Sequence, residues 1–388
     1  MSLRLVVLRD VCAQDRTSVR PGQGDGLPYL GLEGIEAGTG QFATGELSKT
    51  PEAPQANSFR FDHRHVLYGK LRPYLNKVAL PTAEGKCSTE IVPLSVLPHL
   101  DRRYLAYYLR SPKTVAQITE RSAGARMPRA DMDFVLSLSM LLPPIEEQRR
   151  IVDLLARAEG IVRLRREAQQ KAAELIPAIF VDLFGDPATN PKQWPVRTLG
   201  EVLAAVDYGS STKASPTGAG LPIIRMGNVT TRGDLDLDDL KFVELSVDDT
   251  ERFRLRTGDL LFNRTNSKEL VGKTGLWGGS LDAVVASYFI RLRARLDVAL
   301  PSYLWAWMNS RHMKRVLFDT ARGAIGQANI NSKELRAFEV AEPPMKLQQA
   351  FEFRVRDMRS ICRQQRAAAS AATAMFQSSL ARAFGGSH

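Results

Sequence analysis

The sequence predicts an α+β protein in which two globular domains alternate with two long helices. Three observations lead to this prediction. A helical apolar stripe of unusual length follows residue 143, a second copy of it begins 200 residues later, and both intervening segments mix strand and helix patterns. We expect four parts, at residues 1–143, 144–185, 186–344 and 345–388, and we expect the two helices to pack against each other.

The first long helix is predicted for residues 146–184. Apolar side chains recur at spacings of three and four residues from Ile151 onward, which is typical of one face of a helix. Pro143 and Pro144 mark its start, since proline can precede a helix but disrupts its interior, and Gly185 is a stop signal. At about 1.5 Å per residue the helix would be roughly 58 Å long, more than the width of a compact domain. It therefore needs a partner along its length.

The second long helix repeats the first at a constant offset of 200 residues, without a gap over 43 positions. Helical periodicity accounts for the apolar matches. It does not account for the paired prolines Pro343-Pro344, for Gln348, or for the terminal Phe384-Gly385, which indicate an internal repeat. The residues expected along the seam between the helices are Ile151, Leu155, Ala158, Arg165, Phe351, Val355, Met358 and Gln365.

The segment before each helix follows one plan. Residues 66–80 have strand-like alternation, residues 101–112 have helical periodicity, and residues 133–142 are predicted to form a last strand. Residues 186–344 repeat this plan with weaker identity, most clearly in the aromatic helix predicted at 301–310. The chain therefore consists of two similar halves of about 200 residues each.

Charge and cysteine content restrict the kinds of protein that this sequence can represent. The net charge of +11 is compatible with nucleic-acid binding but does not require it, because many soluble proteins are moderately basic. Cys12, Cys87 and Cys362 lack metal-ligand spacing and a pairing logic, which favours a reducing compartment. The first residues form a short apolar run without a cleavage site or a membrane span. We expect a cytoplasmic protein without a membrane partner.

Four stretches stand out beside the head-to-tail repetition: PPIEEQ at 143–148, Phe-Gly at 184–185, GDLLFNRT at 258–265 and GAIGQANINSKEL at 323–335. In this combination the chain resembles the specificity subunit of type I restriction–modification systems, and the resemblance extends over its whole length.

The resemblance implies a non-catalytic subunit that reads double-stranded DNA. Each globular half would be a target-recognition domain for one half of a bipartite, asymmetric site, and the helices would pack antiparallel as a spacer. Two methyltransferase subunits, and in the full complex restriction subunits, would dock on the assembly. S-adenosylmethionine would bind the methyltransferase partner, and no cofactor or metal is expected in this chain. Two recognition domains in one chain suit an asymmetric site, because a symmetric dimer would impose a palindromic one.

Basic, amide and aromatic side chains are the candidates for DNA contacts. Arg and Lys can pair with guanine in the major groove, and Asn and Gln with adenine. A phosphate contact or a solvated surface position is the alternative for each of them. The candidates are Lys70, Arg72, Tyr74, Lys77, Arg126 and Arg129 in the first domain, and Arg225, Asn228, Arg264, Asn266, Lys268, Lys273, Gln327 and Asn329 in the second.

Catalytic motifs are missing from the sequence. Residues 267–274 lack the first glycine of a phosphate-binding loop, and His63 and His65 lack a third metal ligand. Two rival hypotheses stay open, a stand-alone DNA-binding regulator and an autonomous DNA-modifying enzyme. The missing motifs disfavour the enzyme, and the repeated helices, which need partners, disfavour the solitary regulator.

Three features depart from a perfect repeat. Residues 124–133 lack the Gln and Asn of the corresponding stretch at 323–335. Pro177 should kink or break the first helix, and the second helix has no counterpart of it. Arg165 and Gln365 lie beside the apolar stripe, where a polar side chain can select the register of two helices; the alternative is that both are solvated.

Overall fold

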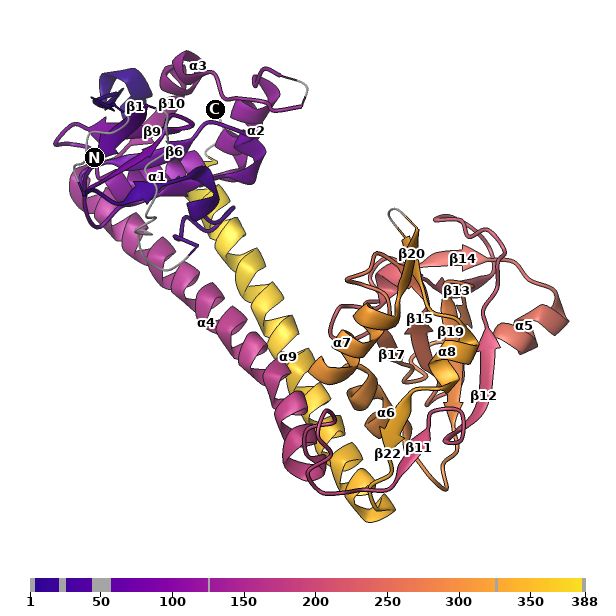
Figure 1. The fold of residues 1–388 in the computed structure, drawn as a ribbon. Helices are drawn as coiled ribbons and strands as arrows, with labels where there is room; N and C mark the ends of the chain where they lie inside the picture. The colour runs from indigo at the N-terminus through magenta and orange to yellow at the C-terminus, as the bar shows by residue number, and fades with distance from the viewer. Residues whose placement is uncertain (1–3, 21–25, 44–56, 125, 325–326, 386–388) are drawn as a thin grey trace. The chain divides into compact units, whose positions relative to one another are not determined.

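The computed structural model describes residues 4–20, 26–43, 57–124, 126–324 and 327–385, with only the backbone of residues 322–324 and 327. The chain forms two compact units (Figure 1). Unit 1 comprises Met1–Glu167 and Arg366–His388, and unit 2 comprises Ala168–Gln365. Each unit holds one β-rich domain and a part of each long helix, so the predicted limits of the four parts stay a prediction.

Two helices of 40 residues dominate the secondary structure, α4 (Ile145–Phe184) and α9 (Met345–Phe384). Each begins directly after a proline pair. Gly185, with φ +87°, ends α4 in the left-handed conformation that glycine adopts at little cost. At about 1.5 Å per residue each helix is roughly 60 Å long. Despite this length, no helix in the described ranges is apolar enough to cross a membrane.

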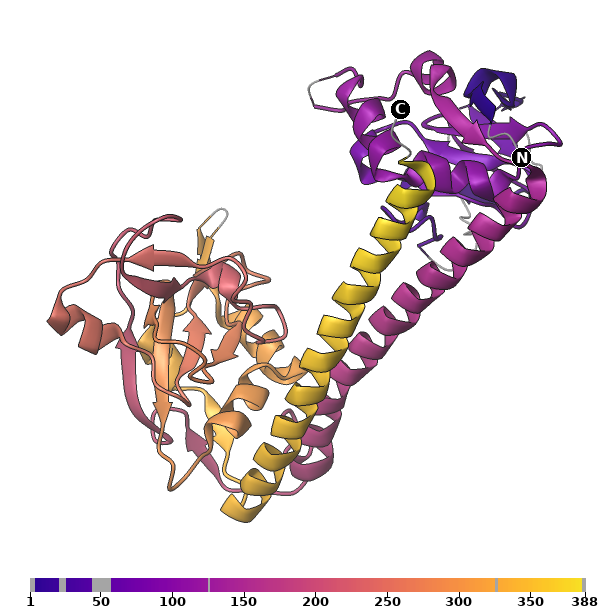
Figure 2. The same cartoon turned by 180° about the vertical axis from the view of Figure 1, so that it is seen from behind.

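The two long helices pack antiparallel in both units, side by side in both views (Figures 1 and 2). In unit 1, Leu155 of α4 and Phe376 and Leu380 of α9 belong to one hydrophobic core. In unit 2, Phe351 of α9 shares a core with Phe180 and other residues from the last turns of α4. The start of one helix therefore meets the end of the other in each unit. The predicted α+β class and the predicted helix pair are confirmed.

Pro177 lies inside α4 without ending it. Of the two predicted outcomes, a kink or a break, the break is absent, although a proline inside a helix costs about 3 kcal/mol through its missing N–H and the clash with the preceding turn. Ile176, Phe180 and Phe184 flank it and are buried in the core of unit 2. Their burial holds the last turns of α4 in helical form.

Within its described residues, the first domain combines short strands with three short helices. Its central sheet has the order β2-β9-β6-β7, with β2 (Cys12–Gln14), β9 (Ile91–Val96), β6 (Val66–Gly69) and β7 (Val78–Ala79). A second sheet has the order β3-β5-β8-β4, with β3 (Ser18–Val19), β5 (Ser58–Phe61), β8 (Gly85–Ser88) and β4 (Tyr29–Leu30). The domain also contains the short 3-10 helices η1 (Leu8–Asp10), η2 (Leu32–Gly34) and η3 (Pro73–Leu75). Its α-helices are α1 (Arg102–Arg110), α2 (Pro112–Glu120) and α3 (Met132–Ser137).

The second domain has the same central strand order, β12-β19-β15-β17, with β12 (Leu203–Tyr208), β19 (Phe289–Ala294), β15 (Leu260–Asn263) and β17 (Thr274–Leu276). Two further sheets have the orders β14-β13-β18 and β16-β21-β20, with β13 (Leu221–Ile224), β14 (Lys241–Val243), β18 (Val284–Val285), β16 (Thr265–Asn266), β20 (Arg322–Ala324) and β21 (Gln327–Asn329). The helical elements are η4 (Met226–Asn228), α5 (Val247–Phe253), α6 (Pro301–Met308), α7 (Arg311–Thr320) and α8 (Ser332–Arg336).

Each domain closes by pairing its first strand with the strand that enters the long helix. β1 (Arg4–Val7) pairs antiparallel with β10 (Ser139–Leu142), and β11 (Val196–Thr198) pairs antiparallel with β22 (Glu339–Ala341). The strand predicted for residues 133–142 is only partly correct. Asp131 caps helix α3, accepting hydrogen bonds from the N–H groups of Asp133 and Phe134, so the strand begins only at Ser139.

A buried glutamine fixes the start of each long helix to its domain. Gln148 accepts a hydrogen bond from the N–H of Asp101 (2.8 Å) and donates to the carbonyls of His99 (2.9 Å) and Pro143 (2.8 Å). Gln348 has the same three kinds of partner in the second half, at 2.8–3.0 Å: the N–H of Leu300 and the carbonyls of Val298 and Pro343. We call this arrangement the glutamine clamp. Both glutamines are fully buried.

We predict that Gln148→Met lowers the free energy of unfolding by about 3 kcal/mol, because one buried N–H and two buried carbonyls lose their partner. Urea denaturation checks this. The matched control is Gln170→Met on the exposed face of the same helix, which should change stability by less than about 0.5 kcal/mol. Equal effects of the two substitutions would contradict a role for the clamp.

Candidate nucleic-acid interface

The fold brings the first domain's candidate residues together from two segments. Strand β6 ends at Gly69, and the loop that follows pairs with residues 128–130. The N–H of Ala130 donates to the carbonyl of Lys70 (2.8 Å), and the N–H of Arg72 donates to the carbonyl of Pro128 (2.7 Å). Leu71 and Arg129 form a β-bridge between these bonds. Lys70, Arg72 and Arg129 therefore lie on adjacent backbone segments, which we call the first junction.

The second domain builds the same junction from the corresponding segments. The N–H of Ile330 donates to the carbonyl of Arg264 (3.0 Å), matching the bond between Ala130 and Lys70. Strand β16 pairs with β21, which sets Thr265 opposite Asn329. Arg264, Asn266 and Asn329 thus lie on adjacent segments, which we call the second junction. The two sets of candidates occupy equivalent places in the two halves.

Exposed cations line the first junction. Arg72 and Arg126 are exposed and, among the described residues, have no ion-pair partner. Tyr74 is 52% exposed beside them. Arg129 is exposed too, but its guanidinium donates two-pronged hydrogen bonds of 3.0–3.1 Å to the carboxylate of Glu90. The net positive charge of this surface therefore comes mainly from Arg72, Arg126 and the half-buried Lys70.

Arg72 has a strained backbone. Its φ of +52° and ψ of +65° fall in the left-handed region, which costs a residue other than glycine about 1–2 kcal/mol. The hydrogen bond from its N–H to Pro128 and the turn at Pro73–Leu75 hold it there. Glycine or asparagine would adopt this conformation more readily, so strain and an exposed guanidinium coincide at a candidate contact.

Aromatic rings position the cations of the second junction. The guanidinium of Arg264 lies 4.9 Å from the ring centre of Tyr208 and donates to the carbonyl of Ser287 (3.2 Å). The ammonium of Lys268 lies 4.3 Å from the ring of Phe318. The sequence analysis missed Tyr208 and Phe318. Tyr208 is the last residue of β12 and precedes Gly209, a signal for a strand-end side chain that could have identified it.

Amides supply the remaining polar groups of the second junction. Asn329 is exposed, and its side-chain oxygen accepts a hydrogen bond from the hydroxyl of Thr265 (3.3 Å). Asn266 is half-buried, donating to the side-chain oxygen of Asn263 (3.1 Å) and accepting from the N–H of Ser267 (2.9 Å). The side chain of Gln327 lies outside the part of the chain that the structure describes.

Two candidate lysines have a structural role. Lys77 donates through Nζ to the carbonyl of Leu32 in η2 (2.7 Å), and Lys273 donates to the carbonyls of Met226 (3.0 Å) and Val229 (2.6 Å) at η4. The backbones of both lysines pair with the end of the central strand in the same way. Burial lowers the pKa of Lys273. These ammonium groups are engaged inside the protein, so we remove both residues from the proposed set of DNA contacts.

Asn228 is also engaged internally. It is buried, accepts a hydrogen bond from the N–H of Arg225 (2.9 Å) and donates to the carbonyls of Asp236 (3.0 Å) and Asp239 (2.9 Å). It has no free edge for a base, and we remove it from the set. Arg225 remains in the set, with a side chain that is 24% exposed and paired with Asp239.

The seam candidates divide into buried and solvated positions. Leu155, Phe351 and Val355 are buried, and Ile151, Ala158, Met358 and Gln365 are half-buried. Arg165 is exposed, in agreement with the alternative that it is a solvated position. The side-chain oxygen of Gln365 is buried without a hydrogen-bond partner among the described residues.

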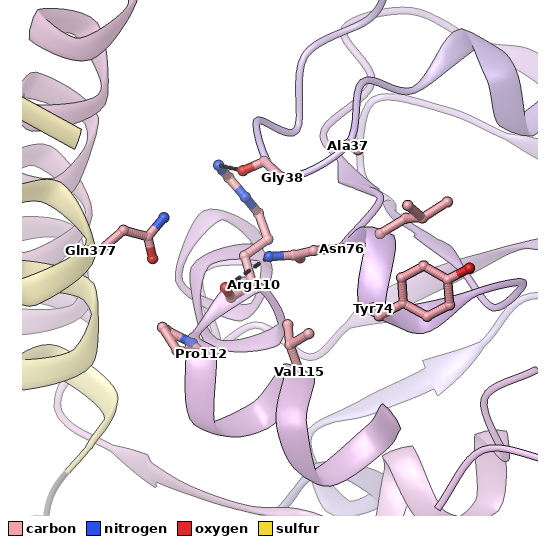
Figure 3. Close-up of a pocket in the computed structure, with 9 residues that line it drawn as sticks. Ala37, Gly38, Tyr74, Asn76, Arg110, Pro112, Val115 and Gln377 are labelled. Carbon is pink, nitrogen blue, oxygen red and sulfur yellow. Dashed lines mark hydrogen bonds between the residues drawn. The ribbon is translucent and has the colours of Figure 1, made fainter. Parts of the chain in front are cut away.

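A shallow cavity of about 390 Å³ adjoins the first junction (Figure 3). It lies between Tyr74 and Asn76 on one side and Gln377 of α9 on the other. Asn76 donates to the carbonyl of Arg110 (3.1 Å), whose guanidinium donates to the carbonyl of Gly38 (3.1 Å). Neither this cavity nor any other part of the described chain gathers three His, Cys, Asp or Glu side chains that could hold a metal.

Comparison with known proteins finds related sequences and related folds of one kind. No protein-family model matches the sequence. The chain is 27% identical over 302 residues to the EcoKI type I restriction enzyme specificity subunit of Escherichia coli (strain K12), covering 73% of this chain and 65% of that relative. It is 20% identical over 402 residues to the StySPI specificity subunit of Salmonella potsdam, covering 98% of this chain and 86% of the relative.

The chain is similar in sequence to type I restriction enzyme specificity subunits over most or all of its length. The resemblance inferred from the sequence is confirmed. The chain spans slightly less than two thirds of the length of the E. coli relative.

Two solved structures of type I restriction–modification systems share the fold. An S subunit from M. genitalium matches with a TM-score of 0.60 at 12% identity, over 100% of this chain and 97% of that one. A chain from a study of complex assembly and conformational transition in a type I system matches with a TM-score of 0.57 at 22% identity, over 99% and 98%. Both structures therefore share the overall fold of this chain.

We predict that Arg72→Gly raises the free energy of unfolding by about 1 kcal/mol, because glycine removes the left-handed strain. Arg72→Ala, which keeps the strain and removes the guanidinium, serves as the control and should not be stabilising. Thermal unfolding of both variants checks this. If the two substitutions shift the melting temperature equally, the backbone at position 72 is not strained.

Proposed function

We propose that this chain is the non-catalytic, DNA-reading subunit of a type I restriction–modification complex. The observation that carries the proposal is the repeated junction: each β-rich domain has a polar, cation-bearing surface at the same place relative to its central strand. The similarity to type I restriction enzyme specificity subunits supports the same conclusion. In this proposal the first junction reads one half of a bipartite DNA site and the second junction reads the other half.

The chemistry of the two junctions differs at equivalent positions. Lys70 and Arg72 of the first correspond to Arg264 and Asn266 of the second. Arginine and lysine suit guanine and phosphate, whereas asparagine pairs best with adenine. Different side chains in equivalent places support two different half-sites and therefore an asymmetric target, which a single chain with two domains can read without a symmetric dimer.

The long helices offer surfaces for partner subunits. Leu154, Ile161 and Leu175 of α4 are 57%, 53% and 46% exposed and follow the seven-residue spacing of a helical stripe. Ile361 and Met375 take the repeat positions of the last two on α9 and are 39% and 69% exposed. Exposed apolar side chains in such a pattern are typical of docking sites. We assign them to the methyltransferase subunits, and their repetition favours two such subunits.

The partners and location complete the proposal. Restriction subunits would join the same assembly, and S-adenosylmethionine would bind the methyltransferase subunits, which carry out the chemistry. The three cysteines, Cys12, Cys87 and Cys362, are unpaired. Unpaired cysteines support a reducing compartment, and we propose that the protein acts in the cytoplasm.

The proposal predicts that mutations in each junction affect one half of the target only. Mapping methylated bases in cells with the intact gene, with a deletion and with single variants tests this. We expect one bipartite motif to lose methylation in the deletion. Arg72→Ala should weaken or relax only one half of this motif, and Arg264→Ala only the other, each by roughly 10- to 100-fold for a base contact.

Arg163→Ala is the matched control, because Arg163 belongs to neither junction and is exposed on the side of α4 opposite Leu154 and Ile161. It should leave both half-sites unchanged. The proposal would be contradicted if every motif stayed methylated in the deletion strain. It would also be contradicted if each junction variant weakened recognition of both half-sites equally.

A further inference from the structure

The two recognition domains dock on the long helices in equivalent ways. Beside the glutamine clamp, Tyr104 of α1 has its ring 5.0 Å from that of Phe384 and donates its hydroxyl to the carbonyl of Leu141 (3.0 Å). Tyr303 of α6 lies 4.9 Å from Phe184 and donates to the carbonyl of Ala341 (2.7 Å). Each domain therefore contacts the start of its own helix and the end of the other through matching residues.

The two docking contacts differ at the helix position eleven residues after each clamp glutamine. In the first half the position is Glu159 of α4. Its carboxylate accepts hydrogen bonds from the guanidinium of Arg110 and from the hydroxyl of Tyr107 (2.9 Å). Arg110 is 7% exposed, and its guanidinium also packs 5.4 Å from the ring of Tyr107. An acidic side chain on the helix thus pairs with a buried cation of the first domain.

In the second half the corresponding position is Arg359 of α9, and the charge is reversed. Its guanidinium lies 4.0 Å from the ring centre of Trp305, whose indole N–H donates to the carbonyl of Gly233 (2.9 Å). The counterpart of Arg110 is Asn309, which hydrogen-bonds to the backbone of Thr274 and Trp305. Burial lowers the pKa of Arg359, with Asp234 opposing this effect. A cation on the helix thus stacks on an aromatic face of the second domain.

The two contacts are chemically incompatible with each other. If the first domain docked on α9, the buried Arg110 would face Arg359, with two cations and no acceptor between them. If the second domain docked on α4, the carboxylate of Glu159 would face the electron-rich ring of Trp305, which attracts cations and repels anions. Burying a like-charged or unpaired group is among the costliest changes in a protein interior. The shared clamp, being identical in both halves, cannot discriminate.

We propose that Glu159 and Arg359 are positioning residues that restrict each recognition domain to its own place in the chain. This inference goes beyond the proposed function. It concerns which helix accepts which domain, and it predicts that domains exchanged between the two positions dock only when residues 159 and 359 are exchanged with them.

A substitution cycle in the full-length chain tests the first contact. Glu159→Arg should lower the melting temperature of unit 1 by roughly 10 °C, because it sets a cation against buried Arg110. Adding Arg110→Asn, the residue of the second half, removes this repulsion and should restore at least half of the loss. Glu167→Arg, the same charge change at an exposed position of α4, should shift the melting temperature by less than about 2 °C. Additive losses in the double variant would overturn the proposal.

Exchange of the domains tests the selectivity itself. In one chain, residues 1–143 and 186–343 trade places, which keeps a proline pair before each helix, and a second such chain also carries Glu159→Arg and Arg359→Glu. The second chain should melt higher than the first, and the same two substitutions in the native domain order should lower the melting temperature. If the substitutions have the same sign of effect in both domain orders, residues 159 and 359 do not discriminate. Melting is measured without DNA, so this result is independent of the proposed DNA recognition, which methylation mapping tests separately.

Discussion

The attachment of each domain to the helix pair is the constraint on which the rest of the structure depends. Most of the stability of a helix in a protein comes from tertiary packing of its apolar face. The two helices of 40 residues therefore depend on contacts along their length. The buried clamps of Gln148 and Gln348 set where each helix starts relative to its domain. Phe184 and Phe384 fix the opposite ends against Tyr303 and Tyr104. With both ends held, the antiparallel pairing of α4 and α9 follows within each unit.

This attachment also explains the position of the junctions. The strand that enters each long helix, β10 or β22, pairs with the first strand of its domain, and the stretch before it carries Arg129 or Asn329. The clamp, the closing strand pair and the junction are therefore successive parts of one continuous segment. A side chain in the junction is tied through a short, hydrogen-bonded path to the helix. Such a connection is consistent with the proposed function, in which DNA recognition would depend on the position of each domain along the helical spacer.

Sequence periodicity was sufficient to predict the helices and the duplication, because apolar spacing and proline pairs are local signals. It failed where tertiary contacts determine the local conformation. Pro177 remains helical since its neighbours Ile176 and Phe180 are buried, and no local rule contains that information. Residues 133–142 alternate like a strand, but the cap at Asp131 starts a helix. An Asx residue before the run was the available signal.

The candidate contacts show the same limit. Lys77 and Lys70 look alike in sequence, yet the ammonium of Lys77 is engaged with the carbonyl of Leu32, whereas Lys70 lies at the first junction. Asn228 and Asn329 differ in the same way, one buried in a turn and one exposed. Side-chain type identifies which chemistry a residue can offer. Only the fold shows whether that chemistry is already used inside the protein.

The proposal with the most direct test is that the long helices act as a spacer between two independent readers. Deleting one heptad from each helix, residues 161–167 and 361–367, keeps the seven-residue pattern and shortens the pair by about 10 Å. The measurement is the DNA motif whose methylation in cells depends on this gene. The account predicts two unchanged half-sites separated by fewer unspecified bases, roughly three fewer at about 3.4 Å per base pair. An unchanged separation, or altered half-sites, would contradict it.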